Sequence, residues 1–252
     1  KTADIGIGMG ITGTEVSKGA SDMVLADDNF STIVVAVEEG RKVFSNIQKA
    51  IQYLLAANLG EVLTLFIATI LGWSILAPVH ILWINLVTDT FPAIALGLEN
   101  DEKDVMKRKP RGRNSNFFSN GVLGSVIYQG ILEGGITLFV YWWAVTYPVH
   151  ANDVAMHLDA KTMAFATLGL IQLFHAFNVK SIHQSIFTVG IFKNKTFNYA
   201  IVLSFVLLAA TIVVPGLNDV FGVAHLDSHQ WGVVVAAAFS IIPIVECVKF
   251  VL

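Results

Sequence analysis

The chain has 252 residues, of which 54% are hydrophobic and only 14% are charged. Soluble domains carry about 25% charged residues, so this composition indicates a protein that folds within a bilayer. The formal net charge of −3 argues against a nucleic-acid partner. The single cysteine, Cys247, excludes a framework of internal disulfides.

The first forty residues are soluble in character. We expect short buried strands at residues 4–9 and 22–26, with a helix at residues 14–20 between them that Thr12 or Thr14 caps. This unit is too short to be a domain, so we interpret it as the end of an α/β domain. Because neither an initiator Met nor a signal peptide precedes Lys1, we interpret the chain as part of something longer or as a processed product.

A glycine-rich segment, Gly8-Met9-Gly10-Ile11-Thr12-Gly13, lies between the first predicted strand and the helix. It matches the G-x-G-x-x-G pattern of dinucleotide-binding folds. Such a site needs a doubly wound sheet, which forty residues cannot supply. We therefore interpret the segment as a tight turn.

Six apolar runs follow, each close to the roughly 20 residues that a helix needs to cross a bilayer. The predicted spans are residues 51–71, 78–98, 121–146, 162–178, 197–214 and 231–252. The stretch from residue 30 to 52 is amphipathic, so we expect one helix to run from water into the first span.

Lysine and arginine gather before span one, between spans two and three, and between spans four and five, whereas the other three connections hold only Lys161. Positively charged residues stay on the cytoplasmic side of a membrane. Both chain ends are therefore expected in the cytoplasm. The short outer connections suggest a bacterial plasma membrane.

Polar side chains interrupt the first two spans at helical spacing. Asn58 and Glu61 share a face of span one, and Asn85, Thr88 and Asp89 share a face of span two. An Asp at the centre of a membrane helix costs at least ~2.5 kcal/mol on insertion, which makes such residues candidates for function. Calcium takes 6–8 oxygen ligands from carboxylates, amides and hydroxyls, and these five side chains supply that mixture. The alternative for each is an interhelical hydrogen bond.

Further polar residues lie in the later spans. Span four carries Gln172 and His175, and we interpret the histidine as a packing residue. Glu133 in span three and Glu246 in span six lack polar companions at helical spacing, so we interpret them as interhelical or interfacial.

Proline and glycine predict local helix geometry around the polar cluster. Pro78 and Pro92 bracket it and should loosen the backbone of span two. Gly60, with Gly130 and Gly134 at small-xxx-small spacing in span three, should let two helices approach closely.

Several long motifs resemble those of type II P-type ATPases. The segments 3–16 and 21–30 resemble the end of the phosphorylation domain of that family. Asn58-Leu59-Gly60-Glu61-Val62 and the segment 82–89 resemble the fifth and sixth membrane helices of calcium pumps of the sarcoplasmic-reticulum type. The resemblance covers the whole chain and is strongest over residues 1–98.

The resemblance implies a fold and a domain division. The fold would be an all-α membrane bundle of six transmembrane helices, the fifth to tenth of ten, preceded by a small α/β remnant. Residues 1–40 would be the end of the cytoplasmic, haloacid-dehalogenase-like phosphorylation domain, and residues 41–252 the transmembrane cation-transport domain.

The resemblance also implies a ligand set. The family binds transported calcium at the positions of the five cluster residues named above and, in the two-calcium pumps, at a glutamate where this chain has Gln172. Plasma-membrane calcium pumps also have glutamine there. Those pumps, however, replace the acid matching Glu61 and carry methionine at the position of Thr88.

The function that the resemblance implies is the ion-translocating half of an ATP-driven calcium pump. Because Glu61 and Asp89 carry two negative charges and Gln172 is neutral, we expect one Ca²⁺ per cycle with proton countertransport. The family's Asp-Lys-Thr-Gly-Thr loop, nucleotide domain and magnesium loop are absent from the printed sequence, so no catalytic or cofactor-binding residue is assigned. ATP and Mg²⁺ would act through the missing N-terminal part of the pump. The expected partners are this N-terminal part, the lipid bilayer and the transported cation. The alternatives are a six-helix secondary transporter or channel, a pump for another divalent cation such as Mn²⁺, and a non-catalytic membrane fragment.

Overall fold

The computed structural model describes residues 4–99, 105–110, 112, 117–118, 121–150, 152–181 and 185–251. Residue 252 of the sixth predicted span lies outside the described part, as do the basic residues Lys103, Arg111 and Arg113 between predicted spans two and three. The chain divides into two compact units, one of residues 1–45 and 101–110 and one of residues 46–100 and 111–252.

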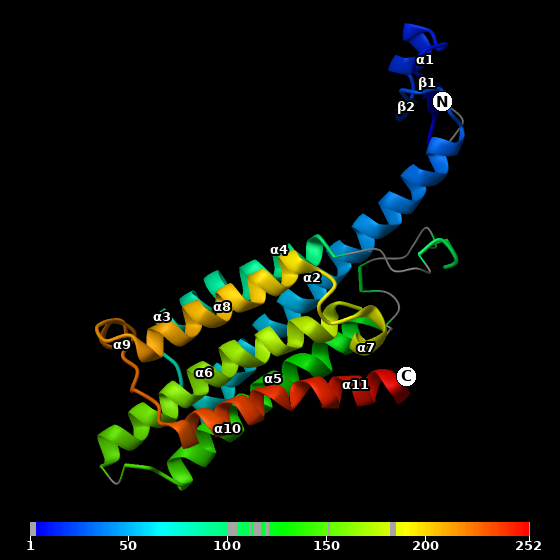
Figure 1. Cartoon of the computed structure of the whole chain (residues 1–252). Helices are drawn as coiled ribbons and strands as arrows, with labels where there is room; N and C mark the ends of the chain where they lie inside the picture. Colours follow the sequence, from blue (N-terminus) through cyan, green and yellow to red (C-terminus); the bar gives the residue numbers. More distant parts are fainter. Residues whose placement is uncertain are drawn as a thin grey trace. The chain divides into compact units, whose positions relative to one another are not determined.

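The first unit opens with a strand-helix-strand motif (Figure 1). Strand β1 (Ile7–Met9) and strand β2 (Met23–Leu25) pair in parallel, and helix α1 (Glu15–Gly19) connects them. Thr14 caps the helix by accepting a hydrogen bond from the backbone N–H of Ser17, as predicted. The prediction that the strands are buried holds only in part, since Gly8 and Leu25 are buried and the other strand residues are not. Val24 is 45% exposed, because a two-stranded sheet has no second layer to cover it.

The glycine-rich segment forms a turn that leaves no room for side chains. A Cβ atom at Gly13 would collide with the carbonyl oxygen of Met9. The Asp28 carboxylate holds the turn by accepting hydrogen bonds from the backbone N–H groups of Ile11 (2.9 Å) and Thr12 (2.7 Å). These bonds, that of Ile11 foremost, lower the pKa of Asp28 to about 2. The glycine pattern thus has a steric explanation.

Helix α2 (Ser31–Ile70) is continuous over 40 residues, which confirms that one helix runs on from the amphipathic stretch into the first span. At 1.5 Å per residue its length is about 60 Å, roughly twice the hydrocarbon thickness of a bilayer. The boundary between the two units falls within this helix, at residues 45 and 46.

The second unit is a helical bundle (Figure 1). Its further elements are α3 (Pro78–Trp83), the π-helical segment η1 (Ile84–Asp89), α4 (Thr90–Gly97), α5 (Val122–Thr146), α6 (Asp153–Val179), α7 (Ile186–Val189), α8 (Lys195–Val213), α9 (Leu217–Phe221), α10 (Ser228–Phe239) and α11 (Ile241–Val251). Within the described residues, six helical segments are long and apolar enough to cross a membrane, as predicted.

Helix α6 lies at the centre of this bundle and packs against α5, α8, α10, α11 and η1. Its side chains Phe165, Leu168 and Ile171 are fully buried and anchor the main apolar core. The helix begins nine residues before the predicted span, because Asn152 caps it by accepting a hydrogen bond from the N–H of Val154. The apolar pattern had marked only the membrane part.

Candidate cation site

The second membrane span changes helix type where the polar residues lie. Its segment Ile84–Asp89 is π-helical, a form that occurs mostly as single turns at functional sites. Pro92 contributes to this, because it has no N–H to donate to the carbonyl of Thr88 four residues earlier. The predicted loosening of the backbone is confirmed.

Two side chains from other helices bond to the carbonyls in this segment. The hydroxyl of Tyr53 on α2 donates to the Thr88 carbonyl (2.7 Å), and the hydroxyl of Ser204 on α8 donates to the Val87 carbonyl (2.9 Å). Sequence reasoning missed both residues. Pro92 was the available signal, since an unpaired carbonyl buried in a membrane needs a donor.

The polar side chains of three helices meet around Glu61. One carboxylate oxygen of Glu61 accepts from the amide of Asn85 (2.9 Å), and the other accepts from the amide of Gln172 (3.2 Å). The oxygen of the Gln172 amide accepts in turn from the hydroxyl of Thr88 (2.9 Å). Four of the six predicted ligand residues therefore form one hydrogen-bonded network from α2, η1 and α6.

Asp89 lies at the end of η1 and is 2% exposed. Within the described residues neither of its carboxylate oxygens has a hydrogen-bond partner. It interacts electrostatically with Glu61. A buried carboxylate without a partner is costly, and a bound cation would offset that cost.

Asn58 is the predicted ligand that does not join the network. Its side chain is exposed, and its amide donates to the carbonyl of Leu54 one turn earlier (2.7 Å). The structure thus brings four of the six residues together directly, places Asp89 close enough to interact with Glu61, and leaves Asn58 on the outer side of α2.

The glycines predicted to allow close helix contact do so. A Cβ atom on Gly60 would lie 3.3 Å from the carbonyl oxygen of Gly130, and one on Gly134 would lie 3.0 Å from the carbonyl oxygen of Gly60. Both distances are shorter than ordinary van der Waals contact. Helices α2 and α5 therefore approach backbone to backbone beside Glu61.

The remaining buried polar residues differ in their surroundings. Glu133 is fully buried against α2 and α6, which fits an interhelical position and excludes an interfacial one. Glu246 forms an ion pair with Lys249 (3.1 Å) one turn along α11. His175 stacks on Tyr53 with ring centroids 6.4 Å apart, and its Nε2 lies 3.9 Å from Oε1 of Glu133.

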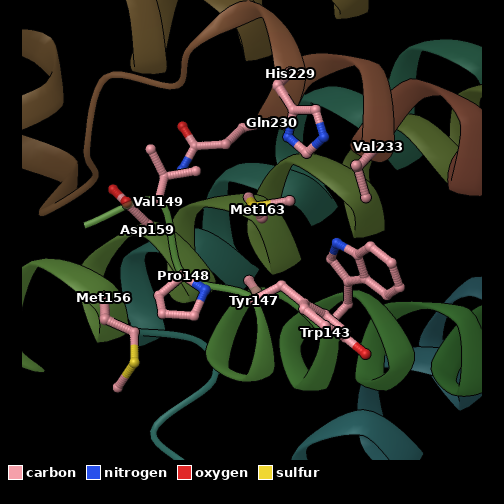
Figure 2. Close-up of a pocket in the computed structure, with 11 residues that line it drawn as sticks. Trp143, Tyr147, Pro148, Val149, Met156, Asp159, Met163, His229, Gln230 and Val233 are labelled. Atoms are coloured by element: carbon pink, nitrogen blue, oxygen red, sulfur yellow. The ribbon is translucent and has the colours of Figure 1, made fainter. Parts of the chain in front are cut away.

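Figure 2 shows a small pocket at the end of the bundle where α5 and α6 are joined. Trp143 and Tyr147 from α5 and its end, Met163 from α6, and His229 and Val233 from α10 line it. It contains none of the cluster residues.

The described residues hold no group of three or more His, Cys, Asp or Glu side chains that could bind a metal ion. Such groups are typical of zinc and other transition metals. A mixed set of carboxylate, amide and hydroxyl oxygens is instead the donor set of calcium.

Comparison with known proteins gives these observations a family. Residues 73–251 match the model of the family described as "Cation transporting ATPase, C-terminus". The chain belongs to this family of cation-transporting P-type ATPases. It is 44% identical, over 97% of its length, to calcium-transporting ATPase 1 of Bacillus cereus, and 42% identical, over 93%, to the calcium-transporting ATPase of Bacillus subtilis. It is also 37% identical, over 99%, to an endoplasmic reticulum calcium ATPase of Aspergillus fumigatus.

This P-type ATPase chain spans 26 to 28% of the length of those three relatives. The six apolar helices and the family membership show that the chain is a multi-pass integral membrane protein. It corresponds to the C-terminal part of a type II pump. The polar cluster thus lies on membrane helices of a chain from a cation-transporting ATPase family.

Proposed function

We propose that this chain is the ion-translocating part of an ATP-driven calcium pump. The observation that carries the proposal is the network joining Glu61, Asn85, Thr88 and Gln172 next to the unpartnered Asp89. The relatives in Bacillus are named calcium-transporting ATPases, which supports calcium as the cargo.

The polar cluster would bind a cation when amide oxygens replace the amide N–H groups that now face Glu61. As the side chains lie, two amide N–H groups bond to the Glu61 carboxylate. An amide also carries an oxygen, so rotation of Asn85 and Gln172 would turn two oxygens toward a cation while freeing both oxygens of Glu61. Asp89 adds a second carboxylate, and Asn58 would join from α2 if its side chain changed rotamer.

Charge supports one calcium ion per cycle. Glu61 and Asp89 supply two negative charges, and Gln172 is neutral where the two-calcium pumps carry an acid. Two calcium ions would bring four positive charges, which is expensive in a site of low dielectric. A carboxylate on the fourth membrane helix of the full pump, as in the family, would make three negative charges, so that one calcium ion leaves spare negative charge for a proton. We therefore propose one ion with proton countertransport, and Gln172→Glu should move the pump toward a second ion.

Residues outside the cluster define the rest of the proposal. The printed sequence holds no Asp-Lys-Thr-Gly-Thr segment, so these 252 residues alone should neither hydrolyse ATP nor form an acyl-phosphate. ATP and Mg²⁺ would act through an N-terminal part of the pump, and residues 1–40 would be the end of its phosphorylation domain.

We propose that the protein lies in a bacterial plasma membrane and that both ends of this chain face the cytoplasm. Transport of Mn²⁺ is the second candidate, because it shares oxygen ligands with calcium.

The test uses a full-length pump that ends in this sequence. Glu61→Gln and Asp89→Asn should abolish calcium-dependent phosphorylation by ATP, whereas phosphorylation by inorganic phosphate, which uses the ion-free form, should persist. Glu246→Gln, which changes a membrane acid already paired with Lys249, is the matched control and should retain both reactions. Normal calcium activation of both cluster variants would show that the ion binds elsewhere.

A further inference from the structure

Glu133 of α5 and His175 of α6 face one another inside the bundle, outside the hydrogen-bonded cluster. Both side chains are fully buried, and the Glu133 Oε1 and His175 Nε2 atoms lie 3.9 Å apart. Within the described residues, neither oxygen of Glu133 and neither ring nitrogen of His175 has a hydrogen-bond partner. Burying four polar atoms without hydrogen bonds costs free energy, so we infer that the pair binds an ion or a proton in at least one state of the pump.

A proton fits this pair better than a metal ion does. Calcium needs 6–8 oxygen ligands, and the pair offers one carboxylate and one imidazole. Within the part of the chain that the structure describes, no third His, Cys, Asp or Glu completes a metal site there. A proton needs a single acceptor, and carboxylate and histidine side chains are the groups that membrane proton relays use.

The pair lies close enough to the polar cluster to interact with the charges of Glu61 and Asp89. A Cβ atom on Gly60 would lie 3.0 Å from the Cβ of Glu133 and 3.3 Å from its Oε2, so the Glu133 side chain lies against the residue that precedes Glu61. Glu133 interacts electrostatically with Glu61 and Asp89. His175 stacks on the ring of Tyr53 from α2 and interacts electrostatically with Lys249 on α11.

We propose that Glu133 and His175 bind the counter-transported proton of the pump, an inference that rests on the function proposed above. A divalent cation at Glu61 and Asp89 repels a proton held on the pair and expels it. When the cation leaves, three carboxylates remain in one apolar region, and a proton taken up by the pair reduces their mutual repulsion. Binding of the cation and of the proton are thereby opposed.

The experiment is calcium uptake by the full-length pump in proteoliposomes that contain a trapped pH indicator. Compared with the wild type, Glu133→Gln should still accumulate radioactive calcium but should export about one proton fewer per calcium ion. Each proton released on binding changes the apparent calcium dissociation constant by about tenfold per pH unit, and Glu133→Gln should lose that factor. Glu39→Gln, which changes an exposed acid of the first unit, is the control and should keep the wild-type ratio.

The outcomes separate this inference from the proposed function. A wild-type pump that moves no calcium would contradict the proposed function. An unchanged proton-to-calcium ratio and pH dependence in Glu133→Gln would overturn the pair alone, as would loss of calcium binding at high pH, since Glu133 would then be a calcium ligand. If Glu133→Gln fails to fold, Glu133→Asp replaces it in the experiment. This variant keeps the carboxylate, so it should keep the wild-type proton-to-calcium ratio while shifting the pH at which calcium affinity is half-maximal. Loss of the wild-type ratio in Glu133→Asp would overturn the proposal.

Discussion

Pro92 determines which backbone oxygens near the polar cluster need a partner from another helix. Because it has no N–H, the Thr88 carbonyl bonds to the hydroxyl of Tyr53 instead. Removing that hydroxyl leaves a buried carbonyl without a donor, at a cost of about 1–3 kcal/mol.

We therefore expect Tyr53→Phe to lower the free energy of unfolding by this amount and to weaken calcium binding, whereas Tyr199→Phe, at an exposed position, should change neither. Pro92→Ala restores the N–H, so in its presence the cost of Tyr53→Phe should fall. This double-mutant cycle is measured by denaturation in detergent. Equal costs in both backgrounds would show that the two residues are independent.

Asp28 gives the first unit a dependence on acid. Its folded-state pKa of about 2 lies below the ordinary value of 3.8, so the stability that its hydrogen bonds provide is present above about pH 4 and is lost as the pH falls toward 2. Asp28→Asn should remove this dependence, while Glu39→Gln should keep it. Amide hydrogen exchange of Ile11 and Thr12, followed against pH, is the measurement. Equal protection at pH 2 and pH 5 in the wild type would contradict it.

At the scale of elements, the contact between α2 and α5 depends on which face of α5 each glycine occupies. A Cβ atom on Gly134 would press on the backbone of Gly60, whereas one on its neighbour Gly135 would meet nothing within 4 Å. We expect Gly134→Ala to destabilise the protein by about 1–3 kcal/mol through overpacking. Gly135→Ala should be neutral or should stabilise the helix by up to about 1 kcal/mol. Equal effects of the two changes on unfolding in detergent would refute this account of the contact.

Much of the fold followed from residue patterns, and much of the site did not. Apolar runs predicted the six spans, and the prolines predicted the loosened backbone. Helical spacing placed Asn85, Thr88 and Asp89 on one face, but it carries no information about contacts between distant helices. The bond from Tyr53 to Thr88 and the approach of Glu133 to His175 depend on how α2, α5 and α6 pack, so neither was predicted. Asn58 shared the predicted face of Glu61, yet its short side chain bonds back to its own helix.

At the scale of the whole molecule, the distribution of lysine and arginine predicts which ends of the helices face the cytoplasm. The test starts from a Cys247→Ser background, because Cys247 is a free, exposed thiol. A cysteine at Lys107 should react with a membrane-impermeant reagent only in opened cells, and one at Ser228 should react in intact cells. The opposite pattern would invert the bundle and contradict the proposed cytoplasmic ends.

We propose that one calcium ion binds among Glu61, Asn85, Thr88, Asp89 and Gln172. Equilibrium binding of radioactive calcium to the full-length pump measures this, with the number of phosphorylation sites as the reference. We expect one ion per site in the wild type, with a Hill coefficient near one, and none in Asp89→Asn. Two ions per site with a Hill coefficient near two, or undiminished binding in Asp89→Asn, would contradict it.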